Sequence, residues 1–194
     1  KLQIHHIDVG QGDGILLISP LGQTALFDDG EYTNCTGIKT YLQGRGITTV
    51  DYHFCTHYHA DHIGCIDDLA AIGITIGTTG YDRGYSYSSA TYTAYVNTLG
   101  AKRVTIAKGQ TITLDAGAAN PVLIKCVDLN GAGVYSPSGS DENAKSAVYK
   151  VTYGAFDEAL GGDLTGSTTS GNDVETTVGP EMGDVEVYKV HHHG

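Results

Sequence analysis

Four side chains that commonly bind metal ions fall within six residues of this 194-residue chain: His57, His59, Asp61 and His62. Side chains two residues apart in an extended segment point to the same side, so His57 and His59 can bind one ion together. Asp61 and His62 begin the following turn and face a neighbouring position. A lone histidine is more often a packed or surface residue, but a cluster of imidazoles with a carboxylate is costly to desolvate unless a cation offsets it. One loop is therefore predicted to supply ligands for two metals.

A second group of histidines, His191 to His193, stands at the end of the sequence. It follows residues 185–190, which have the composition of a strand, so these histidines also lie at a strand end. A remnant of a purification tag is the alternative, but Gly194 after the histidines is unlike a tag end. The remaining histidines are expected to be structural: His5, His6 and His53.

The elements that must position these groups can be read from the hydrophobic pattern. Strands are predicted over residues 2–9, 15–19, 24–27, 50–56, 103–107, 111–114, 122–128, 147–153, 156–160 and 185–190. Helices are predicted over residues 37–43, 63–72, 90–99 and 173–181. Residues 78–89, rich in Gly, Tyr and Ser, are expected to form a surface loop, and the first three strands an antiparallel meander. Strands and helices in this order, with polar clusters at strand ends, indicate an α+β or layered α/β domain.

Length and charge exclude several classes of protein. A chain of 194 residues suits one domain, and no apolar run approaches the roughly 20 residues of a membrane span. The net charge is −11, with 22 acidic residues against 11 basic ones, which disfavours extensive binding of duplex DNA through a basic face. The composition, with few lysines, 13 Tyr and 27 Gly, favours an extracellular or periplasmic location and leaves a cytoplasmic one open.

The four cysteines, Cys35, Cys55, Cys65 and Cys126, show no Cys-x-x-Cys spacing and are too sparse for a disulfide framework. Buried free thiols are the favoured interpretation. A bridge such as Cys35 to Cys65, which would need an oxidising compartment, is the alternative.

Residues 56–64 (THYHADHIG) resemble the signature of the metallo-β-lactamase superfamily. Residues 8–13 (DVGQGD) are similar to the opening of the branch that contains the metallo-β-lactamase domain of ComEC-type DNA-internalisation competence proteins. Residues 27–30 (FDDG) resemble the first motif of the superfamily, in which a strand-end Asp braces the metal loop. Later motifs of the same branch are resembled, in order, by residues 142–146 (ENAKS), 162–164 (GDL) and 192–194 (HHG). The resemblance therefore covers nearly the whole chain.

This resemblance implies an αββα sandwich of two mixed β-sheets flanked by helices, formed by residues 1–194 as a single hydrolase domain that lacks its last C-terminal elements. It also implies two divalent metal ions, zinc or manganese, at the edge where strand ends meet. The implied metal ligands are His57 and His59 for the first ion, Asp61, His62 and His193 for the second, and Asp163 bridging both. His192 would face the substrate, although His192 and His193 can exchange these roles.

One departure from the superfamily pattern concerns the first metal. Many members place another histidine between the ligand loop and the bridging Asp, but this chain has no histidine between Ile63 and Tyr188. The first metal would then take Asp141, Glu142, Asn143 or water as a further ligand.

The implied reaction is hydrolysis. Two cations about 3.5–4 Å apart lower the pKa of a bridging water and supply hydroxide near neutral pH. Asp61 would orient this nucleophile and accept its proton, and His192 would stabilise charge on the substrate. The His-His-Gly ending resembles that of phosphoester-cleaving relatives, which favours a phosphodiester or other phosphoester in a small molecule or a short oligonucleotide. Candidate contacts to a phosphate or a base are Tyr81, Arg83, Tyr85 and Tyr87, with a solvated loop as the alternative.

Two other functions stay open. One is a hydrolase of lactone, thioester or β-lactam substrates, and the other is a metal-binding scaffold without catalytic activity. The oligomeric state is not indicated by the sequence.

Overall fold

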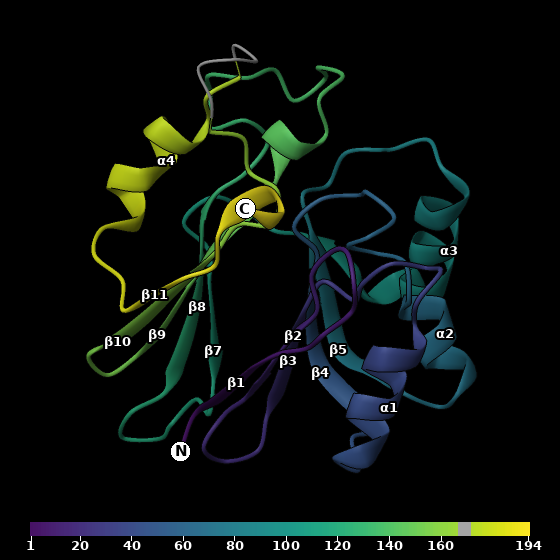
Figure 1. Ribbon diagram of the computed structural model, residues 1–194. Helices are drawn as coiled ribbons and strands as arrows, with labels where there is room; N and C mark the ends of the chain where they lie inside the picture. Colours follow the sequence, from purple (N-terminus) through teal and green to yellow (C-terminus); the bar gives the residue numbers. More distant parts are fainter. Residues whose placement is uncertain (167–171) are drawn as a thin grey trace. The chain divides into compact units, whose positions relative to one another are not determined.

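The computed structural model describes residues 1–166 and 172–194, and the chain divides into two compact units, Lys1–Thr105 and Ile106–Gly194. Each unit contains one mixed β-sheet and its own helices (Figure 1). The predicted α+β class, with two mixed sheets and flanking helices, is confirmed. In the described part of the chain, no helix has the length and apolar character that crossing a bilayer would require.

The sheet of the first unit has six strands in sequence order: β1 (Gln3–His6), β2 (Ile15–Ile18), β3 (Thr24–Phe27), β4 (Thr49–Phe54), β5 (Thr75–Asp82) and β6 (Arg103–Thr105). The strands β1 to β3 form the antiparallel meander that the sequence predicts. From β3 to β6 the pairing is parallel. Parallel neighbours need crossover connections and run in one direction, so the loops that follow β3, β4 and β5 lie at the same edge of the sheet.

The crossovers of this unit are the helices α1 (Thr36–Gly44), α2 (Ile66–Ala71) and α3 (Ala90–Leu99), which lie on one face of the sheet (Figure 1). In α1, Ile38 and Leu42 lie one turn apart and are fully buried in the core that covers this face. At the start of α3, the Ser89 hydroxyl accepts a hydrogen bond from the Tyr92 amide, as expected of an N-cap residue.

Two differences from the prediction in this unit have clear physical reasons. The helix α2 begins three residues later than predicted, because residues 63–65 belong to a tightly packed turn. Strand β5 is missing from the prediction, and its residues 78–82 fall in the predicted surface loop. The glycine and tyrosine content there suggested exposure, but Tyr81 is buried and stacks on Phe54, with 5.4 Å between ring centroids.

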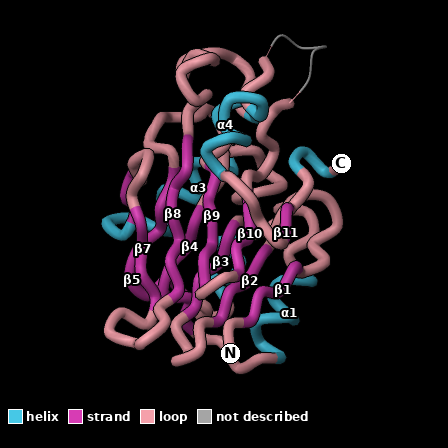
Figure 2. The backbone as a smooth tube through the Cα atoms, turned by 90° about the vertical axis from the view of Figure 1, so that its left-hand side faces the viewer, coloured by secondary structure: helices cyan, strands magenta, loops and turns pink. Residues whose placement is uncertain are grey.

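The second unit has a five-stranded sheet in the order β11-β10-β9-β8-β7. Its strands are β7 (Thr111–Leu114), β8 (Val122–Asp128), β9 (Val148–Tyr153), β10 (Phe156–Leu160) and β11 (Val187–Tyr188). All pairs are antiparallel except β10 with β11. The helix α4 (Glu175–Met182) buries Val178 and Met182 in a core cluster that includes Val127 and Val148. Figure 2 shows these strands in magenta and the helices in cyan.

Candidate metal centre

The histidine-rich loop directly follows β4 at the carboxyl edge of the first sheet. His57 and His62 are buried, whereas His59 and Asp61 are partly exposed. His57 Nε2 lies 3.1 Å from His59 Nδ1, so the two imidazoles turn ring nitrogens toward one another. The amide of His62 donates to the carbonyl of His59 at 3.1 Å, which closes the predicted turn. The first unit thus brings together the four side chains that the spacing singled out.

Asp28 holds this loop from the end of β3. Its carboxylate accepts hydrogen bonds from the Thr56 amide at 2.8 Å, the Thr56 hydroxyl at 2.7 Å and His62 Nδ1 at 2.7 Å. Bonding at Nδ1 fixes the orientation of the His62 ring and the tautomer whose Nε2 can bind a metal. Asp28 adopts a left-handed backbone with φ of 52°, a conformation that Asp and Asn tolerate better than most residues. The bracing role implied by the FDDG motif therefore has a defined geometry.

The neighbouring residues Asp29 and Gly30 also help to hold the ligand loop in place. The Asp29 carboxylate bonds His53 Nε2 at 3.0 Å, and both side chains are fully buried. His53 is therefore packed, as predicted. The amide of Gly64 donates to the carbonyl of Gly30 at 2.9 Å. A Cβ at Gly64 would lie 2.2 Å from the amide nitrogen of Tyr32, so only glycine permits this close approach.

The loop between β1 and β2 reaches the ligand loop from another side. Gln11 Nε2 donates to Asp61 Oδ2 at 3.2 Å, and the Asp13 amide donates to the Asp61 carbonyl at 3.3 Å. A Cβ at Gly12 would lie 1.8 Å from that carbonyl oxygen. In the sequence, this segment stands out only as a family motif, and nothing there indicates a role for Gln11 or Asp13. The structure shows that it positions Asp61.

Asp13 also belongs to a buried group whose ligand-type atoms lie within 4.8 Å of one another: Asp13, Asp28 and His62. Because Asp28 already bonds His62 Nδ1, we interpret this group as one that supports the ligand loop.

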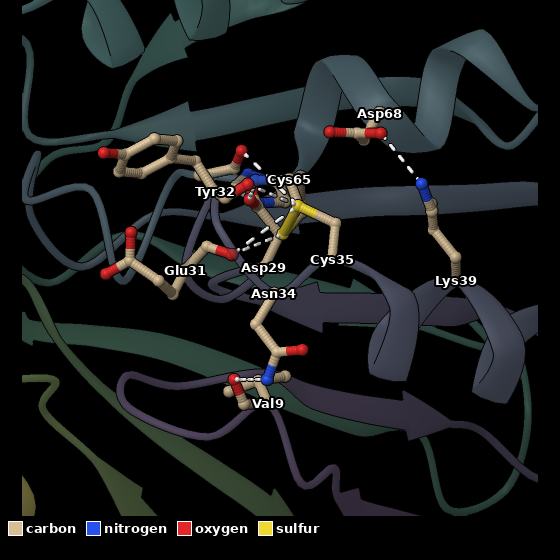
Figure 3. Close-up of a disulfide and its surroundings, with 11 residues drawn as sticks. Val9, Asp29, Glu31, Tyr32, Asn34, Cys35, Lys39, Cys65 and Asp68 are labelled. Carbon is tan, nitrogen blue, oxygen red and sulfur yellow. Dashed lines mark hydrogen bonds and ion pairs between the residues drawn. A yellow bond between two sulfur atoms is a disulfide. The ribbon is translucent and has the colours of Figure 1, made fainter.

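A disulfide joins Cys35 to Cys65, 30 residues apart, next to the ligand loop (Figure 3). The favoured interpretation of four free thiols is therefore wrong for this pair, because the fold brings the two Cα atoms, 30 residues apart in the sequence, to 5.4 Å from one another. The bridge ties the segment that follows the FDDG motif to the first residue before α2. Nearby, Lys39 bonds Asp68 at 2.8 Å and Asn34 donates to the Val9 carbonyl at 3.1 Å.

The other two cysteines are buried free thiols, as predicted: Cys55 and Cys126. Burial raises the pKa of the Cys126 thiol to about 12.

Tyr58 points away from the candidate metal ligands into the first unit. Its ring is fully buried with the Arg83 guanidinium 4.4 Å from its centroid, and its hydroxyl accepts from Arg103 Nη2 at 3.1 Å. Arg103 also pairs with Asp82. Burial raises the pKa of Tyr58, so its hydroxyl stays protonated. Arg83 is only 1% exposed, which is incompatible with direct contact between its side chain and a phosphate and with a solvated loop at this position.

In the second unit, Asp163 follows β10 and lies beside the terminal histidines. Its Oδ2 is 3.3 Å from His193 Nε2 and 3.9 Å from His192 Nε2. Both histidines have left-handed backbones, with φ of 63° and 52°. Such strain persists only where surrounding structure maintains it and is frequent at functional sites. The His192 side chain is 56% exposed, and that of His193 is 30% exposed.

The candidates for a further ligand differ in their surroundings. Asp141 and Asn143 line a pocket of about 430 Å³ together with His192, and Asn143 Nδ2 lies 3.0 Å from His192 Nε2. Glu142 is buried and forms an ion pair with Lys145 at 3.0 Å. Glu142 is therefore engaged in holding its own loop.

His191, the first histidine of the terminal group, is held by α4. Its Nδ1 lies 2.6 Å from Glu175 Oε1 and 3.0 Å from the Tyr188 hydroxyl. The sequence assigned His191 no role, and only its position before His192 could have drawn attention to it.

The donors fit a divalent metal ion such as zinc. Imidazole nitrogens and carboxylate oxygens are its usual non-thiolate ligands, and the Asp28 to His62 bond is the carboxylate–histidine support found behind such ligands. Each unit thus presents a group of imidazoles with a carboxylate at strand ends. Together with two mixed sheets and flanking helices, these features define a class: an α+β protein with candidate metal ligands on strand-end loops.

Comparisons with known proteins agree with this class. A family model described as the metallo-β-lactamase superfamily matches residues 9–87. No curated protein sequence matches the chain. Solved structures of metallo-β-lactamases share its fold. The chain is thus similar to the metallo-β-lactamase superfamily over the segment that carries the ligand loop, and to solved metallo-β-lactamases in its fold.

Three of these structures illustrate the likeness. The metallo-β-lactamase of Cronobacter sakazakii with a HARLDQ motif has a TM-score of 0.58 and 18% identity, over 95% of this chain and 76% of that one. MEM-A1, a subclass B3 metallo-β-lactamase from a soil metagenome library, has a TM-score of 0.57 and 14% identity, over 93% and 73%. The metallo-β-lactamase SMB-1 has a TM-score of 0.56 and 16% identity, over 92% and 69%. At these identities the likeness concerns the fold.

Proposed function

We propose that this chain is a metal-dependent hydrolase with a dinuclear site, acting on a phosphodiester or another phosphoester. The observation that carries the proposal is the ligand loop: three imidazoles and a carboxylate follow one strand, braced by Asp28 and covered by the loop of residues 10–14. These hydrogen bonds hold the imidazoles and the carboxylate close together, as the binding of a cation requires.

The proposed ligands are those that the resemblance to the superfamily implies. His57 and His59 would hold one ion, Asp61, His62 and His193 a second, and Asp163 would bridge the two. Zinc is the preferred metal and manganese the alternative. When bound, the two cations would lower the pKa of water toward neutrality and stabilise negative charge on the substrate.

The chain's own groups have separate roles in this proposal. Asp61, held by Gln11 at its Oδ2, would accept a proton from the attacking water. His192, exposed beside Asp163, would donate a hydrogen bond or a proton to the substrate. Asn143 would orient the His192 ring through the 3.0 Å contact between Asn143 Nδ2 and His192 Nε2.

We infer the substrate class from the net charge of the chain and from the family motifs that it resembles. Residues 8–13 and 192–194 resemble the ComEC-type branch, and His-His-Gly endings resemble those of phosphoester-cleaving relatives. With a net charge of −11, two divalent ions offset only part of the repulsion of a long polyanion. A short oligonucleotide or a small phosphoester is therefore preferred to duplex DNA.

The second candidate function is hydrolysis of β-lactams or other carboxylic substrates, which is favoured by the fold shared with metallo-β-lactamases. A catalytically silent scaffold is the third. An extracellular or periplasmic location is part of the proposal, since the Cys35–Cys65 bridge is typical of oxidising compartments.

The test is elemental analysis followed by assays of the zinc- or manganese-loaded protein on bis-p-nitrophenyl phosphate, a chromogenic cephalosporin and a lactone. We expect two metals per chain and turnover of the phosphodiester only. Asp61→Asn should bind the second metal less tightly and lose most of the turnover. Cephalosporin or lactone turnover would favour the second function, and two bound metals without any turnover would favour the scaffold. Full activity in both His59→Ala and Asp61→Asn would contradict the assigned roles.

A further inference from the structure

Three tyrosines gather beside the ligand loop on the segment that follows β5 and on α3: Tyr85, Tyr87 and Tyr92. The ring of Tyr87 stands edge-on to His59, with 6.0 Å between centroids. It also lies 6.4 Å from the ring of Tyr92 and 6.3 Å from that of Tyr58. We call the three the tyrosine platform. Tyr85 is 47% exposed, and Tyr87 and Tyr92 are half-buried against the core.

Two arginines hold the platform in place from the buried side. The Arg103 guanidinium lies 5.5 Å from the Tyr92 ring, and Arg83 lies 5.8 Å from the Tyr85 ring. The Tyr92 hydroxyl donates to the carbonyl of Tyr85 at 3.2 Å. The aromatic rings are therefore ordered before any ligand arrives, which lowers the entropic cost of binding.

The position of the platform determines what it can bind. The loops after β4 and β5 share one edge of the first sheet, so a substrate whose phosphoryl group reaches His59 extends its neighbouring group toward Tyr87. Tyrosine rings beside buried guanidinium groups suit a planar, electron-poor ring on an anionic substrate.

We propose that the tyrosine platform stacks a nucleobase of the substrate, so that the phosphoester cleaved by this chain belongs to a nucleotide unit. This inference rests on the proposed phosphoesterase function and specifies its substrate class. Stacking of a base on an aromatic side chain contributes about 1–3 kcal/mol, which corresponds to a roughly 5- to 150-fold change in affinity.

The binding test uses the absence of tryptophan from the sequence. Tyr87→Trp introduces a single indole at the platform, and Tyr153→Trp introduces one in β9 as a matched control. The dinucleotide thymidylyl-thymidine should quench the fluorescence of Tyr87→Trp in a saturable manner and leave Tyr153→Trp unchanged, and ribose 5-phosphate should quench neither. Tyr85→Trp serves as the second probe if the first variant does not fold. Equal quenching of platform and control, or none at the platform, would overturn the proposal. Saturable quenching by phenyl phosphate as strong as that by the dinucleotide would overturn its nucleobase assignment.

The kinetic test separates this inference from the function on which it rests. Tyr87→Ala should raise KM for thymidine 5′-(p-nitrophenyl phosphate) by about 5- to 150-fold, with little change for methyl p-nitrophenyl phosphate. An equal change for both esters would overturn the stacking role. If the wild-type protein cleaved neither ester, the proposed function would fail, and the fluorescence experiment would still decide whether the platform binds a base.

Discussion

Replacing Asp28 with Asn tests the brace behind the ligand loop with minimal change in shape. Asn tolerates the left-handed backbone of this position, so the substitution adds no backbone strain. It removes the charge that accepts from the Thr56 amide, the Thr56 hydroxyl and His62 Nδ1. The amide group has a single acceptor oxygen, and its nitrogen must face at least one of these three donors.

The expected magnitude follows from the lost bonds. A hydrogen bond to a charged group contributes about 1.5–3 kcal/mol, so loss of at least one should lower the free energy of unfolding by that amount. Loss of a carboxylate behind a ligating histidine should reduce zinc affinity roughly 10- to 100-fold. Zinc affinity would be measured by competition with a chromophoric chelator, and stability by urea unfolding of the metal-free protein.

Asp51→Asn is the matched control. Asp51 accepts from the Thr24 amide at 2.7 Å and from its hydroxyl at 3.0 Å, near the start of β3 and β4 and without a histidine partner. It should lose a similar amount of stability while keeping zinc affinity. Unchanged zinc affinity in Asp28→Asn, or an equal loss of affinity in both variants, would refute the bracing role of Asp28.

Three further predictions concern the cysteines and α4. Opening the 30-residue Cys35–Cys65 loop with Cys35→Ala should lower the free energy of unfolding by about 3–4 kcal/mol in urea, and an unchanged midpoint would contradict this. Because burial raises the pKa of Cys126 above that of an exposed thiol, the folded state holds its proton more tightly; this contribution is complete below pH 8.5 and is lost as pH rises toward 12. Iodoacetamide at pH 8.5 should accordingly label Cys126 only after unfolding, as mass spectrometry would show. Glu175→Gln should weaken the bond between this residue and His191 and lower the free energy of unfolding by about 1–2 kcal/mol. An unchanged Tm in thermal unfolding would contradict this prediction.

Local signals in the sequence were sufficient for much of the fold. The bounds of β3, β7, β8, β10 and α3 agree with the prediction to the residue, because each has strong periodicity and clear turn residues at its ends. The shift at α2 and the strand β5, which the sequence did not predict, depend on contacts with distant segments. Periodicity carries no information about such contacts.

The same distinction applies to the candidate site. The spacing of His57, His59, Asp61 and His62 identified the loop, since one segment carries all four side chains. Two of the groups that hold it, Gln11 and Asp13, lie 50 and 48 residues before Asp61 and carry no pattern of their own beyond a family motif. Arg83 is a candidate contact to a phosphate or a base in the sequence, with a solvated loop as the alternative, and both interpretations require an exposed side chain. Its burial against Tyr58 depends on aromatic packing that only the folded chain provides.

The cross-link between Cys35 and Cys65 closes a covalent ring that contains α1, β4 and residues 57–62. Arg45 lies exposed in the turn between α1 and β4, within this ring. A protease that cuts after Arg45 would therefore produce a nicked chain whose halves stay attached. The halves would migrate together on a non-reducing gel and separate once thiol is added, so the ligand loop can survive a backbone break that would release it from a linear chain.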